Sequence, residues 1–285
     1  MTISICTVLY HSADVLDSYF ASLKNCITDT DEVLFYDNAP ESKDELRVRE
    51  LAHDHGVNIR YWSGTTNVGF AKACNVLASE SLGNRLIFLN PDTQTISFKR
   101  ECHESNQVLG ATVLNPNGDM EGTFGRTRSV WDEIKLRWLR IAAPCPAGVG
   151  YVSGAALSVD RDAFLSVGGF DEKFFMYFED IDLCLRLNAA GLSVSVDDNW
   201  LLTHVGGSAA KKVKTISAQR SLDSSIYFHT KWGHAVGVYR AFSLLDAALR
   251  VIMWGAKRDV DSRRAYQSLV RSAIHGWTTR KQATN

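Results

Sequence analysis

The chain has 285 residues, of which 45% are hydrophobic and 22% charged, which is typical of one large globular domain or of one domain with an appendage. Its formal net charge of -1 gives no reason to expect a nucleic-acid partner, and no segment reaches the roughly 18 apolar residues of a membrane span. The six cysteines show no C-x-x-C spacing and fit small core residues, so we expect a reducing, cytoplasmic compartment.

The first 90 residues alternate short apolar runs with helical patterns. We predict strands at Ile3–Leu9, Glu32–Tyr36, Val57–Trp62 and Arg85–Leu89, with helices between them at Ala13–Cys26, Lys43–His55 and Phe70–Leu82. This alternation favours an α/β fold with an open, mostly parallel sheet that carries helices on both faces.

The middle of the chain is less regular. A strand, a turn and a strand are predicted at Gly110–Leu114, Asn117–Asp119 and Met120–Phe124. The following elements are predicted in order as helix Trp131–Ile141, loop Pro144–Gly150, strand Val152–Val159, helix Asp160–Val167, helix Glu179–Ala190 and strand Leu192–Val196. Beyond Gly206 and Gly207 the sequence becomes polar and basic, and then helical.

Charge is distributed unevenly along the chain. From Val205 onward there are 14 basic and 4 acidic residues, whereas residues 1–204 hold 17 basic and 28 acidic ones. A basic tail on an acidic body indicates an anionic partner for the tail. Phe242, Leu245, Leu249 and Ile252 recur at helical spacing. This helix therefore either lies on an anionic membrane or packs on the rest of the protein or on a second subunit.

Polar residues cluster where the four N-terminal strands end. The segments concerned are Tyr10–His11, Asp37–Asn38, Thr65–Gly69 and Asn90–Thr93. Each of them alone also fits an ordinary turn. The carboxyl ends of strands form the ligand crevice in open α/β sheets, so we expect the four loops to converge on one edge.

Two of these segments, and a histidine further along the chain, have specific chemistry. Asp92, held directly after an apolar strand, suits a hard divalent cation that carries phosphate oxygens, although Asn90-Pro91-Asp92 without metal is a plain turn. Gly69 starts a helix whose N-terminus offers N–H groups to an anion, and Lys72 and Asn75 share one face of that helix or are simply solvated. His204 is followed by glycines that allow close approach to a ligand, but a lone histidine is more often structural.

Three carboxylates stand beside the apolar segment Phe174–Phe178. They are Glu179, Asp180 and Asp182, at the start of a predicted helix. Acidic residues are common in first turns, but an ionised carboxylate in an apolar segment needs a partner or a polar cleft.

Taken together, these motifs resemble glycosyltransferase family 2, and most closely its bacterial rhamnosyltransferase branch, which builds cell-wall linkers and O-antigen. The matching segments are Val8–Tyr10, Tyr36–Ala39, Asn67–Ala71, Leu89–Thr93, Val152–Ala155, Gly168–Glu172, Phe175–Leu183 and His204–Ser208.

The resemblance implies a GT-A fold with a catalytic domain over residues 1–208, divided into a nucleotide-binding half (1–93) and an acceptor half (94–208). Residues 209–285 would form a helical, basic extension. It also implies a nucleotide-sugar donor, most simply dTDP-L-rhamnose, with transfer by inversion to a glycan or lipid-linked acceptor. Another nucleotide sugar, such as an activated galactofuranose or N-acetylhexosamine, is the alternative.

The resemblance also implies residue roles. Asp180 would be the general base, and Glu179 would touch the acceptor. Asp92 and His204 would hold Mg²⁺ or Mn²⁺, although Asn90 stands where many relatives carry a first aspartate. The implied donor-binding residues are Thr7, Tyr10, Asp37, Asn38, Asn67, Gly69, Lys72, Asn75 and Asn90.

Two rival functions use the same residues differently. A non-catalytic sugar-nucleotide or glycan-binding module would keep the strand-end loops without needing Asp180. A glycoside hydrolase with two carboxylates would release free sugar without a nucleotide. The expected location is the cytoplasm or the inner face of the cell membrane, as a monomer or a homo-oligomer.

Overall fold

The computed structural model of the chain divides into two compact units. It describes residues 1–105, 107–125, 129–131, 149–204, 214–256, 263, 266–267 and 270–271. The sheet unit comprises Met1–Thr127 and Pro144–Ala209, and the helical unit comprises Arg128–Ala143 and Ala210–Asn285. Among the described residues, no helix is both long and apolar enough to cross a membrane.

The first half of the sheet unit alternates strands and helices, as predicted. Its elements are β1 (Ile3–Leu9), α1 (Ala13–Leu23), β2 (Glu32–Asp37), α2 (Asp44–His55), β3 (Ile59–Ser63), α3 (Phe70–Glu80) and β4 (Arg85–Leu89). All of β4 is buried, as expected for a central strand covered on both faces. α2 ends where Gly56 adopts a left-handed conformation with φ 64°.

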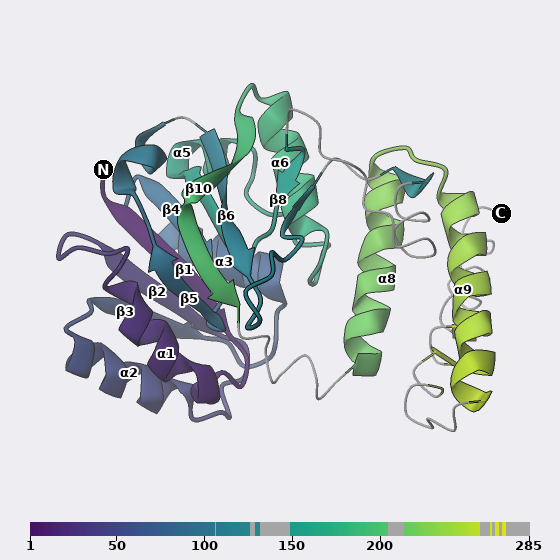
Figure 1. The fold of residues 1–285 in the computed structure, drawn as a ribbon, viewed down its shortest axis with the longest axis horizontal. Helices are drawn as coiled ribbons and strands as arrows, with labels where there is room; N and C mark the ends of the chain where they lie inside the picture. The colour runs from purple at the N-terminus through teal and green to yellow at the C-terminus, as the bar shows by residue number, and fades with distance from the viewer. Residues whose placement is uncertain are drawn as a thin grey trace. The chain divides into compact units, whose positions relative to one another are not determined.

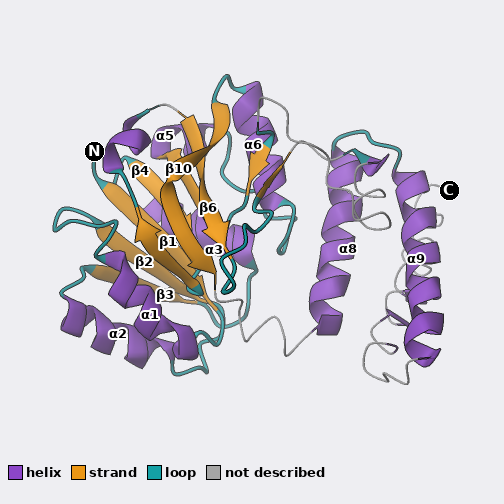
Figure 2. Ribbon diagram, viewed as in Figure 1, coloured by secondary structure: helices purple, strands orange, loops and turns teal. Residues whose placement is uncertain are grey.

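Helices cover both faces of the sheet (Figure 2). Ile3, Ile5 and Leu9 of β1 pack in one core cluster with Leu16 and Phe20 of α1. Ser4, Cys6 and Val8 point to the opposite face, which α3 covers, because side chains alternate along a strand. The burial of both faces explains why β1 reads as a continuous apolar run.

The second half of the sheet unit mixes short strands with helices. Its elements are β5 (Thr93–Ser97), the 3-10 helix η1 (Arg100–Glu104), β6 (Gln107–Leu114), β7 (Phe124–Gly125), β8 (Tyr151–Val152), β9 (Ala156–Asp160), α5 (Arg161–Ser166), α6 (Glu179–Ala189) and β10 (Ser193–His204). β5 was not predicted from the sequence, and β10 is longer than predicted because it continues past a register shift between Asp197 and Leu201.

Eight strands form one sheet in the order β3-β2-β1-β4-β9-β6-β10-β5 (Figure 1). The pairs β3–β2, β2–β1, β1–β4 and β6–β10 are parallel. β9 and β5 run antiparallel to their neighbours. The predicted α/β class with a mostly parallel sheet is therefore confirmed.

The predicted hairpin around Asn117–Asp119 forms only in part. Leu114 and Met120 make an isolated bridge, and the strand that follows, β7, has two residues. The side-chain oxygen of Asn115 accepts hydrogen bonds from the backbone N–H groups of Asn117 (2.9 Å) and Asp119 (3.0 Å). These side-chain hydrogen bonds close a local turn in place of the backbone hydrogen bonds between strands that a regular hairpin would have.

The predicted strand Val152–Val159 is interrupted at residues 153–155, between β8 and β9. The backbone groups of the interruption bond to other parts of the unit instead of to a neighbouring strand. The N–H of Ser153 donates to the carbonyl oxygen of Thr123 at 2.7 Å, and the carbonyl oxygen of Ala155 accepts from the N–H of Asn90 at 3.0 Å.

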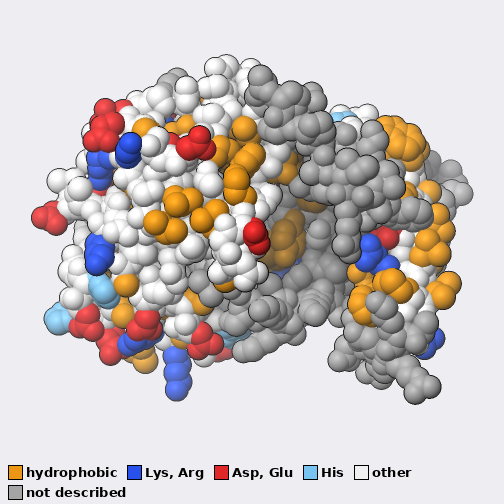
Figure 3. Space-filling view, viewed as in Figure 1, with side chains coloured by type: hydrophobic (Ala, Val, Ile, Leu, Met, Phe, Trp, Pro, Cys, Tyr) orange, Lys and Arg blue, Asp and Glu red, His pale blue; other side chains and the backbone are white. Residues whose placement is uncertain are grey.

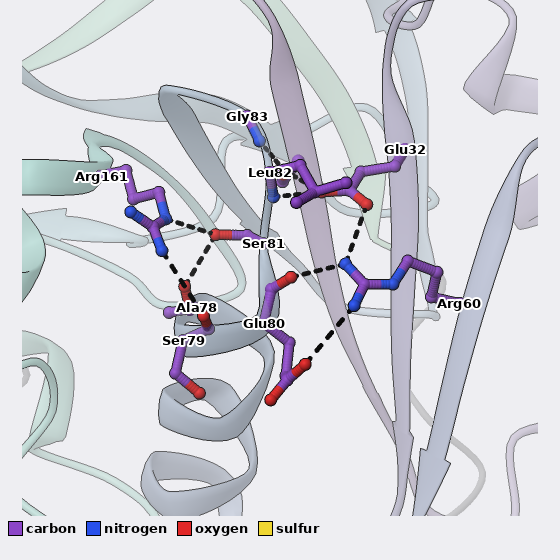
Figure 4. A network of polar contacts seen from close by, with 10 residues as sticks. Glu32, Arg60, Ala78, Ser79, Glu80, Ser81, Leu82, Gly83 and Arg161 are labelled. Carbon is purple, nitrogen blue, oxygen red and sulfur yellow. Dashed lines mark hydrogen bonds and ion pairs between the residues drawn. The ribbon is translucent and has the colours of Figure 1, made fainter.

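A polar network at the amino ends of the strands ties the end of α3 to the sheet (Figure 4). The Glu32 carboxylate accepts hydrogen bonds from the Ser4 hydroxyl (2.7 Å) and from the Leu82 N–H (2.6 Å). Arg60 donates to Glu32 at 3.4 Å and to the carbonyl oxygen of Glu80 at 2.5 Å. Because the side chain of Glu32 is only 7% exposed, this network supplies the partners that a buried carboxylate needs.

The helical unit contains α8 (Lys214–Lys231) and α9 (Val236–Ala256), so the predicted C-terminal helices are present. Leu222 of α8 packs with Tyr239 and Ala247 of α9 and with Val130. The predicted helix at 131–141, apart from its first residue, and the first part of the loop at 144–150 lie outside the described residues.

Candidate active site

The predicted strand-end residues lie at one edge of the sheet. β1 to β4 run parallel to one another. β6 and β10 run in the same direction, because β9 is antiparallel to both β4 and β6. The carboxyl ends of these six strands therefore share one edge, and Figure 1 shows the arrowheads of β6 and β10 ending together there.

Asp37 ends β2 and is only 1% exposed. One carboxylate oxygen accepts a hydrogen bond from the N–H of Ala39 (2.7 Å), and the other accepts from Tyr61 (2.8 Å) and Ser42 (3.3 Å). Burial raises the pKa of Tyr61, and the hydrogen bond to Asp37 raises it further. Asp37 therefore fastens the loop that follows β2 to strand β3. Its predicted contact with a nucleobase stays a prediction.

Thr7 and Tyr10 lie in different environments, although both were predicted to adjoin the base. Thr7 is fully buried, and its hydroxyl lies 2.5 Å from the Tyr19 hydroxyl of α1. Tyr10 is 41% exposed at the end of β1. Of the two side chains, Tyr10 is the one that a ligand at this edge can reach.

Asn38 connects the end of β2 to the loop before α3. Its side chain accepts a hydrogen bond from the N–H of Val68 (3.0 Å) and donates to the carbonyl oxygen of Gly69 (3.2 Å). Asn67 closes the same loop, because its side-chain oxygen accepts from the N–H of Gly69 at 2.9 Å. The two asparagines thus fix the backbone that leads into the N-terminus of α3.

Gly69 allows the start of α3 to approach the apolar segment before α6. Its φ of 88° and ψ of 172° fall in a region that is almost restricted to glycine. A Cβ atom here would collide with the carbonyl oxygen of Phe175, which accepts a hydrogen bond from the N–H of Phe70 at 2.8 Å. This contact brings together two motifs that lie about 100 residues apart.

Lys72 and Asn75 lie in different environments on α3. Lys72 is exposed on α3. The side chain of Asn75 bonds to both backbone groups of Phe170, at 2.8 and 2.9 Å, and to the carboxylate of Glu172 at 3.2 Å. Asn75 therefore fastens the loop before α6 to α3, and its predicted contact with the donor stays a prediction.

His204 lies between two carboxylates. Its Nε2 is 3.2 Å from Asp92 Oδ2, and its Nδ1 is 2.8 Å from Glu121 Oε2. The hydrogen bond to Asp92 and the two negative charges raise the pKa of His204 to about 9, against a smaller opposing effect of burial. The structure thus brings together the two predicted metal ligands and adds Glu121, which sequence reasoning missed.

Asp180 lies in the first turn of α6 and contacts the interruption between β8 and β9. Its Oδ2 accepts a hydrogen bond from the N–H of Gly154 at 3.0 Å, and its Oδ1 accepts from the N–H of Ile181 at 2.8 Å. The next residue, Ala155, accepts from the N–H of Asn90. A short chain of hydrogen bonds thus connects the candidate base to the strand end that leads to Asp92.

The other two carboxylates of α6 point into the protein. Asp182 is fully buried and pairs with Arg186 at 2.8 Å. Glu179 is 6% exposed, and its Oε2 has no hydrogen-bond partner among the described residues. Burial, and then the charge of Asp180, raise the pKa of Glu179 well above its usual range. The predicted contact of Glu179 with an acceptor stays a prediction.

Two residues before α6 have unusual backbone angles. Tyr177 and Phe178 have φ of 72° and 69°, which is uncommon for bulky side chains. Such strain persists only where the surrounding structure enforces it, and it concentrates at functional sites. Here the two residues set the direction in which α6 starts, with Glu179 pointing inward and Asp180 half exposed.

The side chains around His204 fit a divalent cation in part. Asp92 and His204 offer a carboxylate and an imidazole, which Mn²⁺ accepts together with phosphate oxygens. In the described part of the chain, no group of three or more His, Cys, Asp or Glu side chains is arranged to hold a metal by itself. The remaining coordination positions would fall to water or to a bound diphosphate.

Sequence reasoning missed three residues of this edge. Gly154 lies in a segment with a family-like motif, but nothing in that motif identifies its N–H as a donor to Asp180. Tyr61 lies within an ordinary strand pattern. Glu121 lies in an irregular loop, and its place beside His204 depends on a sequence separation of 83 residues that no local signal reveals.

Comparison with known sequences supports the resemblance seen in the motifs. Residues 4–96 match the family model for glycosyl transferase family 2. The N-acetylglucosaminyl-diphospho-decaprenol L-rhamnosyltransferase of Mycobacterium tuberculosis is 41% identical over 96 residues, which are 32% of this chain and 31% of that protein. The resemblance to family 2 and to rhamnosyltransferases is therefore confirmed, over about a third of the length of the mycobacterial relative.

Solved structures confirm the fold. The mannosyltransferase PcManGT from Pyrobaculum calidifontis, in complex with GDP-Man and Mn²⁺, matches with a TM-score of 0.56 and 13% identity, over 97% of this chain and 83% of that one. S. aureus TarS 1-349 matches with a TM-score of 0.53 and 15% identity, over 97% of this chain and 92% of that one. At this level of identity the likeness shows a shared fold, and the predicted GT-A type architecture is correct.

Proposed function

We propose that this chain is an inverting glycosyltransferase that moves a sugar from a nucleotide-sugar donor to a hydroxyl group of an acceptor. One observation carries the proposal. The hydrogen bonds of Gly154 and Ala155 connect Asp180 to the strand end that leads to Asp92, inside a fold shared with a mannosyltransferase in complex with a nucleotide sugar. A binding module would need no such half-exposed carboxylate at the site.

The donor and acceptor we propose are dTDP-L-rhamnose and a glycan or lipid-linked saccharide. The similarity to a mycobacterial L-rhamnosyltransferase supports this choice. A thermal-shift screen of dTDP-rhamnose, UDP-sugars and GDP-sugars, each with and without Mn²⁺, tests it. The largest rise in Tm is expected with dTDP-rhamnose, and a larger rise with a UDP-sugar would replace rhamnose by galactofuranose or an N-acetylhexosamine.

Inversion requires a single in-line displacement. The acceptor oxygen attacks the anomeric carbon from the face opposite the diphosphate, and the bond from that carbon to the leaving diphosphate breaks. Asp180 takes the proton of the attacking hydroxyl, while the N–H groups of Gly154 and Ile181 hold its carboxylate in place. Asp92 and His204 would hold Mg²⁺ or Mn²⁺, which supplies positive charge to the leaving diphosphate.

Replacing the proposed base tests the reaction directly. Asp180→Asn should lower kcat by about 10²–10⁴-fold, because the amide cannot take the proton. Donor binding, measured as the rise in Tm with the nucleotide sugar, should stay at the wild-type level. Asp162→Asn is a matched control, since its side chain is 94% exposed on α5. Near-wild-type transfer by Asp180→Asn would remove Asp180 from the mechanism, and release of free sugar without acceptor would indicate a hydrolase.

We also propose that α9 contacts an anionic membrane surface. Its most exposed large side chains are Val238, Leu245, Leu249, Ile252 and Met253. Within residues 236–255, no exposed residue of α9 is charged or polar, and Figure 3 shows hydrophobic side chains along this helix. The 14 basic and 4 acidic residues from position 205 onward complement anionic lipid headgroups, which favours a bilayer over a second subunit.

A further inference from the structure

We propose that Glu121 is a positioning residue that orients the imidazole of His204 for a divalent cation. The inference rests on the proposed function, in which Asp92 and His204 are the metal ligands. Glu121 Oε2 lies 2.8 Å from Nδ1 of His204, on the opposite side of the ring from Asp92. A carboxylate that accepts the second ring N–H fixes the tautomer and direction of a ligating histidine and makes the ligating nitrogen more basic.

The backbone carries Glu121 to this place without help from its side chain. Its N–H donates to the carbonyl oxygen of Val113 at 2.8 Å, and its carbonyl oxygen accepts from the N–H of Thr123 at 2.8 Å. The turn before it is closed by the side chain of Asn115. The backbone hydrogen bonds of the loop therefore do not involve the Glu121 carboxylate, as expected for a group that positions another.

The backbone of His204 is equally well fixed, but its ring is not. His204 ends β10, where it pairs with Thr93 of β5, and the preceding Thr203 pairs with Leu114 of β6. Pairing sets the position of the Cα atom and leaves the ring free to turn about its side-chain bonds. Among the described residues, only Asp92 and Glu121 contact the ring nitrogens of His204 and so hold the ring in place.

Each ring nitrogen of His204 faces a different carboxylate. Nε2 and Asp92 Oδ2 face each other at 3.2 Å, a separation that suits two ligands of one cation. Nδ1 faces Glu121, whose side chain is 31% exposed. One carboxylate is enough to pair with the imidazole, so the second one is available to orient the ring.

Mn²⁺ binding to the full chain, measured by titration calorimetry with a saturating nucleoside diphosphate present, tests the inference. Glu121→Ala should bind Mn²⁺ about 10–100-fold more weakly than wild type. The Mn²⁺ affinity of Glu121→Gln should lie between those of wild type and Glu121→Ala, because its amide oxygen still accepts from Nδ1–H but carries no charge. Asp119→Asn is the control. It removes a carboxylate that lies in the same loop but is exposed and does not touch His204.

The outcomes separate this inference from the proposed function. Tm should be nearly unchanged in all three variants. Equal Mn²⁺ affinity in wild type and Glu121→Ala, together with weaker binding by Asp92→Asn, would overturn the role of Glu121 and leave the metal site intact. A large fall in Tm without a change in affinity would make Glu121 a structural latch. Wild type that binds no Mn²⁺ would overturn both the metal site and the inference.

Discussion

Most of the predicted polar residues at the carboxyl edge of the sheet form hydrogen bonds that fix the backbone of the loops. Asn38, Asn67 and Asn75 use their side-chain amides to fasten loops. Asp37 is occupied in the same way by Tyr61 and Ala39. The side chains left to meet a ligand are those with partial exposure, among them Asp92 and Asp180. Motif residues thus divide into those that build the edge and those that a ligand can reach.

Gly69 offers a test of this division at the residue scale. Gly69→Ala should destabilise the chain by about 1–3 kcal/mol, because the φ of 88° strains any residue with a side chain and the new methyl group collides with the Phe175 carbonyl oxygen. Donor affinity should fall as well, since the N-terminus of α3 must move. Urea unfolding and the donor thermal shift measure the two effects.

Gly56→Ala is the matched control for this substitution. Gly56 also has a positive φ, 64°, but nothing lies within 4 Å of a Cβ atom built there. It should show a smaller loss of stability and no loss of donor affinity. Equal effects of the two substitutions would mean that the contact of Gly69 with Phe175 contributes neither to stability nor to donor affinity.

At the scale of elements, η1 and the bulged strand β10 enclose a buried histidine. His103 lies 3.0 Å from the Ser158 hydroxyl and 3.5 Å from Asp197, and its ring stacks on Phe98 at 4.3 Å. Burial lowers the pKa of His103 to about 4, aided by the charges of Arg85 and Arg100 and opposed by Asp197. The folded sheet unit therefore prefers the neutral imidazole.

This preference predicts an acid-sensitive fold. The pKa of His103 is about 4 in the folded chain and 6.5 in the unfolded chain. The stability that neutral His103 contributes to the fold is therefore complete above pH 6.5 and is lost as the pH falls towards 4. The loss from this group is about 3 kcal/mol at most. Urea unfolding between pH 7 and 4 should show a shallower pH dependence in His103→Gln than in wild type.

The exposed His53 provides the control for the pH experiment. His53→Gln should keep the wild-type pH dependence, because that side chain is 91% exposed. His229 of the helical unit also has its pKa lowered to about 4, by burial and by His234, so a remaining slope is expected in His103→Gln. An unchanged slope in His103→Gln would show that His103 does not contribute.

At the scale of the whole molecule, the chain joins a sheet unit that carries the candidate site to a helical unit with an exposed apolar helix. Vesicle flotation tests the proposed role of that helix. Wild type should float with phosphatidylglycerol vesicles and not with neutral phosphatidylcholine vesicles, since charge and apolar contact act together. The double variant Leu249→Glu/Ile252→Glu should lose most of this binding.

Leu46→Glu is the control for flotation, because Leu46 is 74% exposed on α2 and lies outside the helical unit. Equal flotation of wild type and the double variant, or none by either, would overturn the membrane proposal. A change in molar mass of the double variant, measured by light scattering, would identify a second copy of the chain as the partner of α9.

The sequence by itself determined the elements of the first half of the sheet unit and much of the ligand-binding edge. Periodicity located β1, β4 and α3 within two residues at either end, because burial on one or two faces leaves a direct record in the order of apolar residues. Parallel strands also require their carboxyl ends to meet, so the convergence of the loops followed from the element order. The family-like motifs then indicated Asp92, Asp180 and His204.

Only the tertiary structure decided which side chains are available and what they touch. Glu179 and Asp180 are neighbours in one acidic run, yet the start of α6 turns the first inward and leaves the second half exposed. Glu121 meets His204 only because the loop after β6 lies beside the end of β10, which is distant from it in sequence. Hydrogen bonds and ion pairs between distant segments leave no periodic trace, so sequence patterns predict surfaces and strand ends but not partners.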